Sequence, residues 1–178
     1  MPYTTPSTIT TGQLVTPTIM NNEWGGNVSF LANPPACRVT HNAAQSVTNN
    51  VVLWLAFNTE TYDTDSMHDT VTNNSRITIK TAGIYVVTFN VVLGTDNDYG
   101  LIEAIIRLNG TAVIANNGIG TLTSTADSPP LSVATQYKFA VNDYIEAGVY
   151  QVNTSAAANN ALSQSSSPLF AATWIGFG

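Results

Sequence analysis

The chain has 178 residues, of which only 9% are charged, and its formal net charge is −6. A chain of this length is expected to form one compact domain with a short extension, and its core needs no covalent staple. Nucleic-acid binding depends on clustered Lys and Arg, so five basic residues in an acidic chain argue against that class of partner. The neutral polar surface that Asn, Thr, Ser and Gln provide suits an extracellular or virion protein better than a cytosolic enzyme.

The first residues carry neither the basic region nor the apolar region of a secretory signal. No apolar run is long enough to span a bilayer. We therefore expect a protein that is made in a cytoplasm, stays soluble until assembly and has no membrane partner. Cys37 is the single cysteine, so an intrachain disulfide is excluded, and the residue is expected to be a small buried hydrophobe.

Residues 1–35 differ in composition from the rest of the chain. Thr and Pro dominate the first half, and the prolines oppose a helix. Large apolar residues then gather toward the end of the segment, among them Trp24, Phe30 and Leu31. We predict an extended N-terminal arm that uses these three residues as an anchor, with a frayed terminus as the alternative.

From residue 36 to 178 the chain reads as short strands separated by Asn, Gly, Asp, Ser and Pro clusters. In residues 84–93 the odd positions form an unbroken apolar row, which is typical of a strand lying on a core. Asn109-Gly110 supplies the residues of a tight hairpin turn. The pattern predicts an all-β fold, an antiparallel β-sandwich of the jelly-roll type, with strands at 37–41, 51–57, 77–80, 84–93, 101–108, 111–115, 131–141, 144–152 and 169–175.

Two predicted strands, residues 51–57 and 169–175, are apolar on both faces. A strand of a two-layer sandwich has one face on the core, so the other face would expose apolar side chains to water. Contiguous exposed apolar surface usually marks an association site. We therefore predict self-association through Trp54, Phe170 and Trp174; the alternative is that loops or the arm cover these faces within one subunit.

The order of these features resembles the C1q-like/tumour-necrosis-factor-like jelly-roll superfamily. The resemblance covers about four fifths of the chain and rests on the segments Ala36-Cys-Arg-Val39, Ala82-Gly-Ile-Tyr85, Leu108-Asn-Gly110, Val141-Asn-Asp-Tyr-Ile145 and Trp174-Ile-Gly176. It implies a homotrimer whose first and last strands lie on the inner sheet around a three-fold axis.

Two further segments, residues 30–39 and 62–69, look like the version of this superfamily found in tailed-bacteriophage proteins. The chain has neither a collagen-like stalk nor a membrane segment, which disfavours an animal C1q-type protein and a tumour-necrosis-factor-type ligand.

Candidate chemistry is sparse. The loop Asp63-Thr-Asp-Ser-Met-His-Asp69 gathers carboxylates, but its spacing is not that of an EF-hand, so turn capping is preferred over a looser calcium site. His41 and His68 are the only histidines, which excludes a His-rich zinc site. There is no Gly-X-Ser-X-Gly elbow, and Gly118-Ile-Gly120 lacks the context of a dinucleotide site. We predict no enzyme, no cofactor and no metal.

The resemblance leads to two functions. The first is a trimeric capsid decoration (cement) protein of a phage virion, made in the host cytoplasm, whose arm binds the major capsid protein. Three arms per trimer would act together and attach tightly. The second is the receptor-binding knob of a tail or head fibre.

Overall fold

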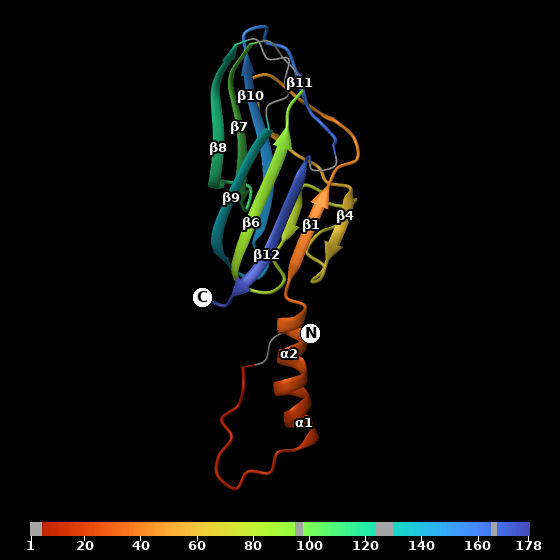
Figure 1. The fold of residues 1–178 in the computed structure, drawn as a ribbon, viewed down its shortest axis with the longest axis vertical. Helices are drawn as coiled ribbons and strands as arrows, with labels where there is room; N and C mark the ends of the chain where they lie inside the picture. The colour runs from red at the N-terminus through yellow and green to blue at the C-terminus, as the bar shows by residue number, and fades with distance from the viewer. Residues whose placement is uncertain (1–4, 95–97, 124–129, 165–166) are drawn as a thin grey trace.

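The computed structural model describes residues 5–94, 98–123, 130–164 and 167–178, and in it two β-sheets stack face to face above a helical segment (Figure 1). The helical segment consists of α1 (Pro17–Ile19), the π-helical η1 (Met20–Gly26) and α2 (Asn27–Ala32). The strands are β1 (Ala36–Thr40), β2 (Gln45–Val47), β3 (Leu53–Trp54), β4 (Thr59–Asp63), β5 (Arg76–Thr78), β6 (Gly83–Val92), β7 (Asp98–Leu108), β8 (Ala112–Thr123), β9 (Pro130–Phe139), β10 (Tyr144–Asn153), β11 (Asn159–Ala161) and β12 (Leu169–Gly176).

Every strand pair within the sheets is antiparallel. The first sheet has the order β4-β1-β12-β6-β9. The second has the order β3-β10-β7-β8, with β5 also paired to β10. β11 and β2 form a small third sheet. The predicted antiparallel β-sandwich is therefore confirmed.

The core lies between the two large sheets and follows the period-two patterns of the sequence. On β6, Tyr85, Val87, Phe89 and Val91 are buried and alternate with partly buried residues, as the apolar row predicted. The facing layer comes from β7 and β10, whose inward rows are also fully buried. Asn109 and Gly110 both have positive φ, 51° and 74°, which confirms the predicted hairpin turn between β7 and β8.

The sequence did not predict three of the strands. β2, β4 and β11 are short and lie outside the strands predicted from the sequence; β2 and β11, which are far apart in the chain, pair with each other, and β4 pairs with β1. Conversely, only Leu53–Trp54 of the expected strand 51–57 pairs as β3. Short edge strands depend on their partners more than on local composition, so period-two patterning does not reveal them.

The extended conformation predicted for the arm is wrong for residues 17–32, which form the helical segment that projects from the base of the sandwich (Figure 1). Pro17 does not oppose this helix because it occupies the first turn, where no backbone N–H is needed. Thr16 caps the helix: its Oγ1 accepts a hydrogen bond from the Ile19 N–H at 3.3 Å.

Gly83 begins β6 where no side chain fits. A Cβ there would lie 2.2 Å from Nε1 of Trp174 and 2.6 Å from the Gly176 carbonyl oxygen, and its φ of +155° is rare for L residues. We expect Gly83→Ala to lower the free energy of unfolding by about 1–3 kcal/mol, since an overpacked site must shift. Gly176→Ala is the control, because a Cβ there meets nothing within 4 Å. Denaturant unfolding at one protein concentration measures both; equal effects would contradict this account.

Candidate functional site

The outward side of the first sheet is formed by small and uncharged side chains at its centre. Opposite residues of an antiparallel pair share a face, so the strand registers define two rows across the sheet. We call this surface the β12 face; its rows are Arg38, Ala171, Thr88 and Ala134, and Ala36, Thr173, Val86 and Gln136. All eight are partly buried or exposed.

Arg38 is the one charged residue of the β12 face. Its Nε is buried and has no hydrogen-bond partner among the described residues. Tyr62 of the neighbouring strand β4 lies opposite it in register and is exposed. Because an unsatisfied buried polar atom costs free energy, this corner of the face is suited to an acceptor from another molecule.

On the outward side of the second sheet, Arg76, Arg107 and Glu146 form a cluster of charged side chains. Glu146 is buried on β10 and accepts hydrogen bonds from the Arg107 Nε at 2.8 Å and from the Ser75 hydroxyl at 2.9 Å. Its Oε2 also lies 2.7 Å from the Arg107 Nη2, and its Oε1 3.5 Å from the Arg76 Nε. Arg76, Arg107 and Glu146 are thus paired with one another, whereas Glu103 of β7 forms no ion pair among the described residues and accepts only a 3.5 Å hydrogen bond from Asn116.

Trp54 packs against Arg107 of this charged cluster. The Arg107 guanidinium lies 3.6 Å from the centre of its ring, and the ring lies so close to Gly148 that a Cβ there would be 2.6 Å from it. The second face of residues 51–57 is therefore covered in part by the chain itself. The assignment of Trp54 to a trimer interface stays a prediction, and its sheet is not the one that carries the β12 face.

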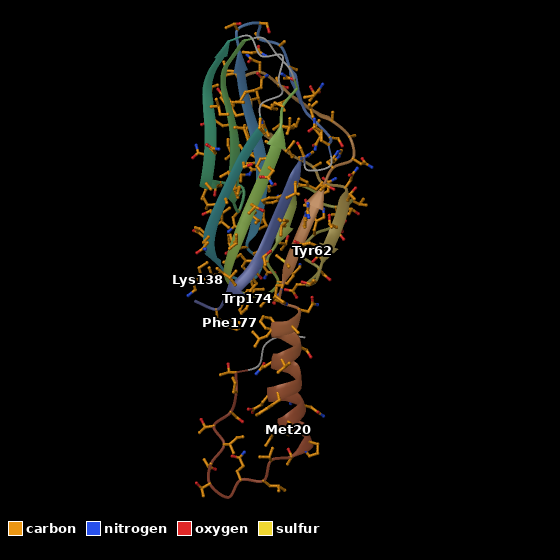
Figure 2. All side chains as sticks on the ribbon, in the orientation of Figure 1. Met20, Tyr62, Lys138, Trp174 and Phe177 are labelled. Atoms are coloured by element: carbon orange, nitrogen blue, oxygen red, sulfur yellow. The ribbon has the colours of Figure 1, made fainter. Side chains whose placement is uncertain are left out.

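Phe170 and Trp174 point into the interior of the sandwich. Phe170 is fully buried against Phe57 and Phe89 in the core. Trp174 is also buried, and its ring meets Phe30 at 5.0 Å and Phe177 at 4.7 Å at the base of the sandwich, near the C-terminus (Figure 2). The predicted exposed face of β12 exists, but Ala171 and Thr173 form it, so the role of Phe170 and Trp174 is corrected to core packing.

Of the three predicted anchor residues, one is buried and two are exposed. Phe30 is buried at the base, against Trp174 and Phe177, so it joins the helix to the sandwich and presents no surface to a partner. Trp24 and Leu31 are exposed, as an anchor requires. Exposed Met20 and Val28 lie at helical spacing from them. This helical spacing is present in the sequence, but it was not used because an extended arm was expected.

A polar cavity of about 430 Å³ lies beside β5. Its lining includes Ser66, His68, Thr72, Asn73, Arg76 and Lys80. His68 holds the wall in place: its Nδ1 lies 2.8 Å from the Arg76 carbonyl oxygen and its Nε2 3.2 Å from that of Phe57. Sequence analysis missed this cavity because its residues come from a loop and a strand that no motif links.

The carboxylates of the loop 63–69 cap turns. Asp63 accepts the backbone N–H groups of Asp65 at 3.2 Å and His68 at 2.9 Å. Asp69 accepts those of Val71 and Thr72, each at 2.8 Å, and these two N–H groups, Thr72 first, lower the pKa of the Asp69 carboxyl. The preferred interpretation of this loop, turn capping, is thus what the structure shows.

The reactive side chains are not gathered into a site. Cys37 is fully buried, and burial, followed by the nearby Asp63 and Glu60 carboxylates, raises the pKa of its thiol. His41 lies on the surface, where its Nδ1 is 2.8 Å from the Ala43 carbonyl oxygen. Among the described residues, no group of three His, Cys, Asp or Glu side chains is placed to hold a metal ion. In the same part of the chain, no helix has the length and apolar character to cross a membrane.

No family model and no curated protein sequence matches the chain. Solved structures do. Murine APRIL at pH 5.0 has a TM-score of 0.59 at 12% identity, over 79% of this chain and 98% of that chain. The globular domain of zebrafish complement 1qA protein has a TM-score of 0.55 at 13% identity, over 81% and 99%. Eiger TNF from S. frugiperda has a TM-score of 0.58 at 13% identity, over 81% and 94%.

Identities this low show a likeness of fold alone. The chain therefore has the jelly-roll sandwich of tumour-necrosis-factor and C1q globular domains, as predicted. The resemblance to a bacteriophage version stays a prediction.

We expect chelation to leave the protein unchanged, because the Asp63 and Asp69 carboxylates already accept backbone N–H groups. The Tm should be the same with EDTA and with millimolar CaCl2. A ligand at a hundredfold excess over its Kd stabilises by about 2.7 kcal/mol, so a bound ion would be visible. A rise in Tm with calcium that Asp69→Asn removes would contradict the capping role.

Proposed function

We propose that the chain is a homotrimeric structural protein of a bacteriophage virion, a capsid decoration protein. Three jelly rolls form a knob, and the N-terminal segment attaches it to the major capsid protein of the shell. The protein is made in the host cytoplasm, catalyses no reaction, and contacts neither nucleic acid nor membrane. The bacteriophage setting rests on the sequence resemblance of residues 30–39 and 62–69.

The observation that carries the proposal is the N-terminal segment. It projects from the base of the sandwich (Figure 1). It also holds seven of the fifteen exposed large hydrophobic side chains of the described residues: Ile9, Leu14, Val15, Met20, Trp24, Val28 and Leu31. Such side chains gain about 25 cal/mol per Å² when a partner removes them from water. A projecting apolar segment below a polar knob suits attachment to a surface.

The β12 face supports the trimer. Its two rows are free of acidic residues, and small side chains such as Ala171 and Ala134 let another sheet approach closely. The outward side of the second sheet is less suited to association, because it carries the charged residues Glu103, Arg107 and Glu146. The resemblance to trimeric jelly rolls also assigns the first and last strands, here β1 and β12, to the inner sheet.

The polar cavity beside β5 favours a second function, a receptor-binding knob of a phage fibre. Hydroxyl and amide groups from Ser66, Thr72 and Asn73 line it together with the cationic Lys80. This set fits a neutral, hydroxyl-rich saccharide, because the Asp69 carboxylate in the same lining offsets the charge of Lys80. Arg76 is less free, because it stacks on Tyr144 at 4.0 Å and faces Glu146.

The location in the virion tests both functions. Gold-labelled antibody against residues 36–178 is added to particles of the phage that encodes the chain, and the particles are imaged by electron microscopy. We expect label over the whole head, because a decoration protein occupies many shell sites. Label confined to the tail tip would support the receptor-binding knob, and particles without label would contradict both.

A charge placed on the β12 face should prevent assembly. Thr88 lies between Ala171 and Ala134 in register, so Thr88→Lys would bury an unpaired ammonium in each interface. We expect light scattering at micromolar concentration to show single chains for this variant. Asn116→Lys, on an exposed position of β8, is the matched control and should leave the trimer intact. A folded Thr88→Lys trimer would contradict the assignment of this face.

A further inference from the structure

The projecting helix carries a stripe of exposed large apolar side chains. Met20, Trp24, Val28 and Leu31 are 44%, 65%, 60% and 64% exposed. Their spacing of four, four and three residues places them on one side of the helix. Met20 lies at the far end of the helix from the sheets (Figure 2). The stripe therefore runs along most of the helix, from Leu31 near the sandwich to Met20 at the far end.

The other sides of the helix are either buried against the same chain or polar. One neighbouring side, with Ile19, Glu23, Asn27 and Phe30, is partly or fully buried against the same chain: the Ser7 hydroxyl donates to Glu23, and Phe30 packs on Trp174. The opposite side is exposed and carries small or polar residues: Asn21, Asn22, Ser29 and Ala32. The stripe is thus the one large apolar surface of this helix that the described residues leave uncovered.

Burial of the stripe would stabilise this helix, which its own chain covers on one side only. The helix spans residues 17–32, and isolated helices of this length are marginal in water. Gly25 and Gly26 weaken it further, each by roughly 1 kcal/mol relative to Ala. Packing of the stripe against another surface would compensate for this.

We infer that the stripe packs against the same stripe of two other copies, so that the three helices form a parallel bundle below the knob. This inference rests on the proposed trimer. The helix is fixed to the strands that carry the β12 face: it leads into β1, Phe30 packs on Trp174 of β12, and the Trp174 N–H donates to the Pro35 carbonyl oxygen at 2.9 Å. Assembly through that face brings the three helices out of the knob at the same end.

A second copy fits the stripe better than a membrane does. Membrane-surface helices carry Lys and Arg beside their apolar face, whereas the first basic residue of this chain is Arg38. Glu23 is the one charged residue of the helix, so three parallel copies meet little repulsion. The spacing of four, four and three residues is that of an eleven-residue repeat, which packs helices into a right-handed supercoil.

The bundle also changes the assignment of the shell anchor. Trp24 and Leu31, predicted to bind the shell, lie in the stripe and are used between the copies. Ile9, Leu14 and Val15 of the segment before the helix remain exposed, and attachment to the shell falls to them.

Cysteine cross-linking of the full-length chain tests the bundle. Val28→Cys places a thiol in the stripe, and Ser29→Cys places one on the polar side at a similarly exposed position. The native Cys37 is buried and stays unreactive. A disulfide needs Cα atoms within about 7 Å, which neighbouring copies reach only inside the bundle. After mild oxidation, we expect most of the Val28→Cys protein, and little of the Ser29→Cys protein, to run as a covalent dimer on a non-reducing gel.

Light scattering on the same samples separates the two proposals. A trimer in which neither Val28→Cys nor a second variant, Leu31→Cys, cross-links would overturn the bundle and leave the trimer standing. Equal cross-linking of Val28→Cys and Ser29→Cys would also overturn it. Single chains in solution would overturn the trimer and the bundle together.

Discussion

The insertion of the last strand, β12, between β1 and β6 is the constraint on which the rest of the structure depends. Its inward residues, Phe170, Ala172 and Trp174, fill the core, while Ala171 and Thr173 between them form the centre of the outward face. One strand therefore builds both the core and the proposed interface. Through Trp174 it also holds Phe30, and with it the helix that leads away from the base.

The outward surfaces of the two sheets differ in their charged side chains. On the second sheet, Arg76 and Arg107 converge on Glu146, and Arg107 covers Trp54, while Glu103 adds a charge without an ion pair among the described residues. On the first sheet the centre is small and uncharged, and the Nε of Arg38 has no partner among the described residues. Desolvating charges is costly, so association is easier through the first sheet.

The sequence predicted the sandwich because period-two rows such as residues 84–93 encode burial directly. It could not assign the second apolar face of 51–57 and 169–175. Whether Trp54 is covered depends on Arg107, a contact that only the fold creates. The conformation of residues 17–32 was missed because a proline at the first helical position looks like a helix breaker in the sequence. The polar cavity beside β5 was missed because it is assembled from non-adjacent residues.

In the proposed assembly, three copies associate through the β12 face. The most direct measurement is the mass of the unmodified protein in solution, by sedimentation equilibrium across the micromolar range. Each chain has a mass of 18.9 kDa, and the account predicts one species of three times that mass. A species of one chain mass at every concentration would contradict it.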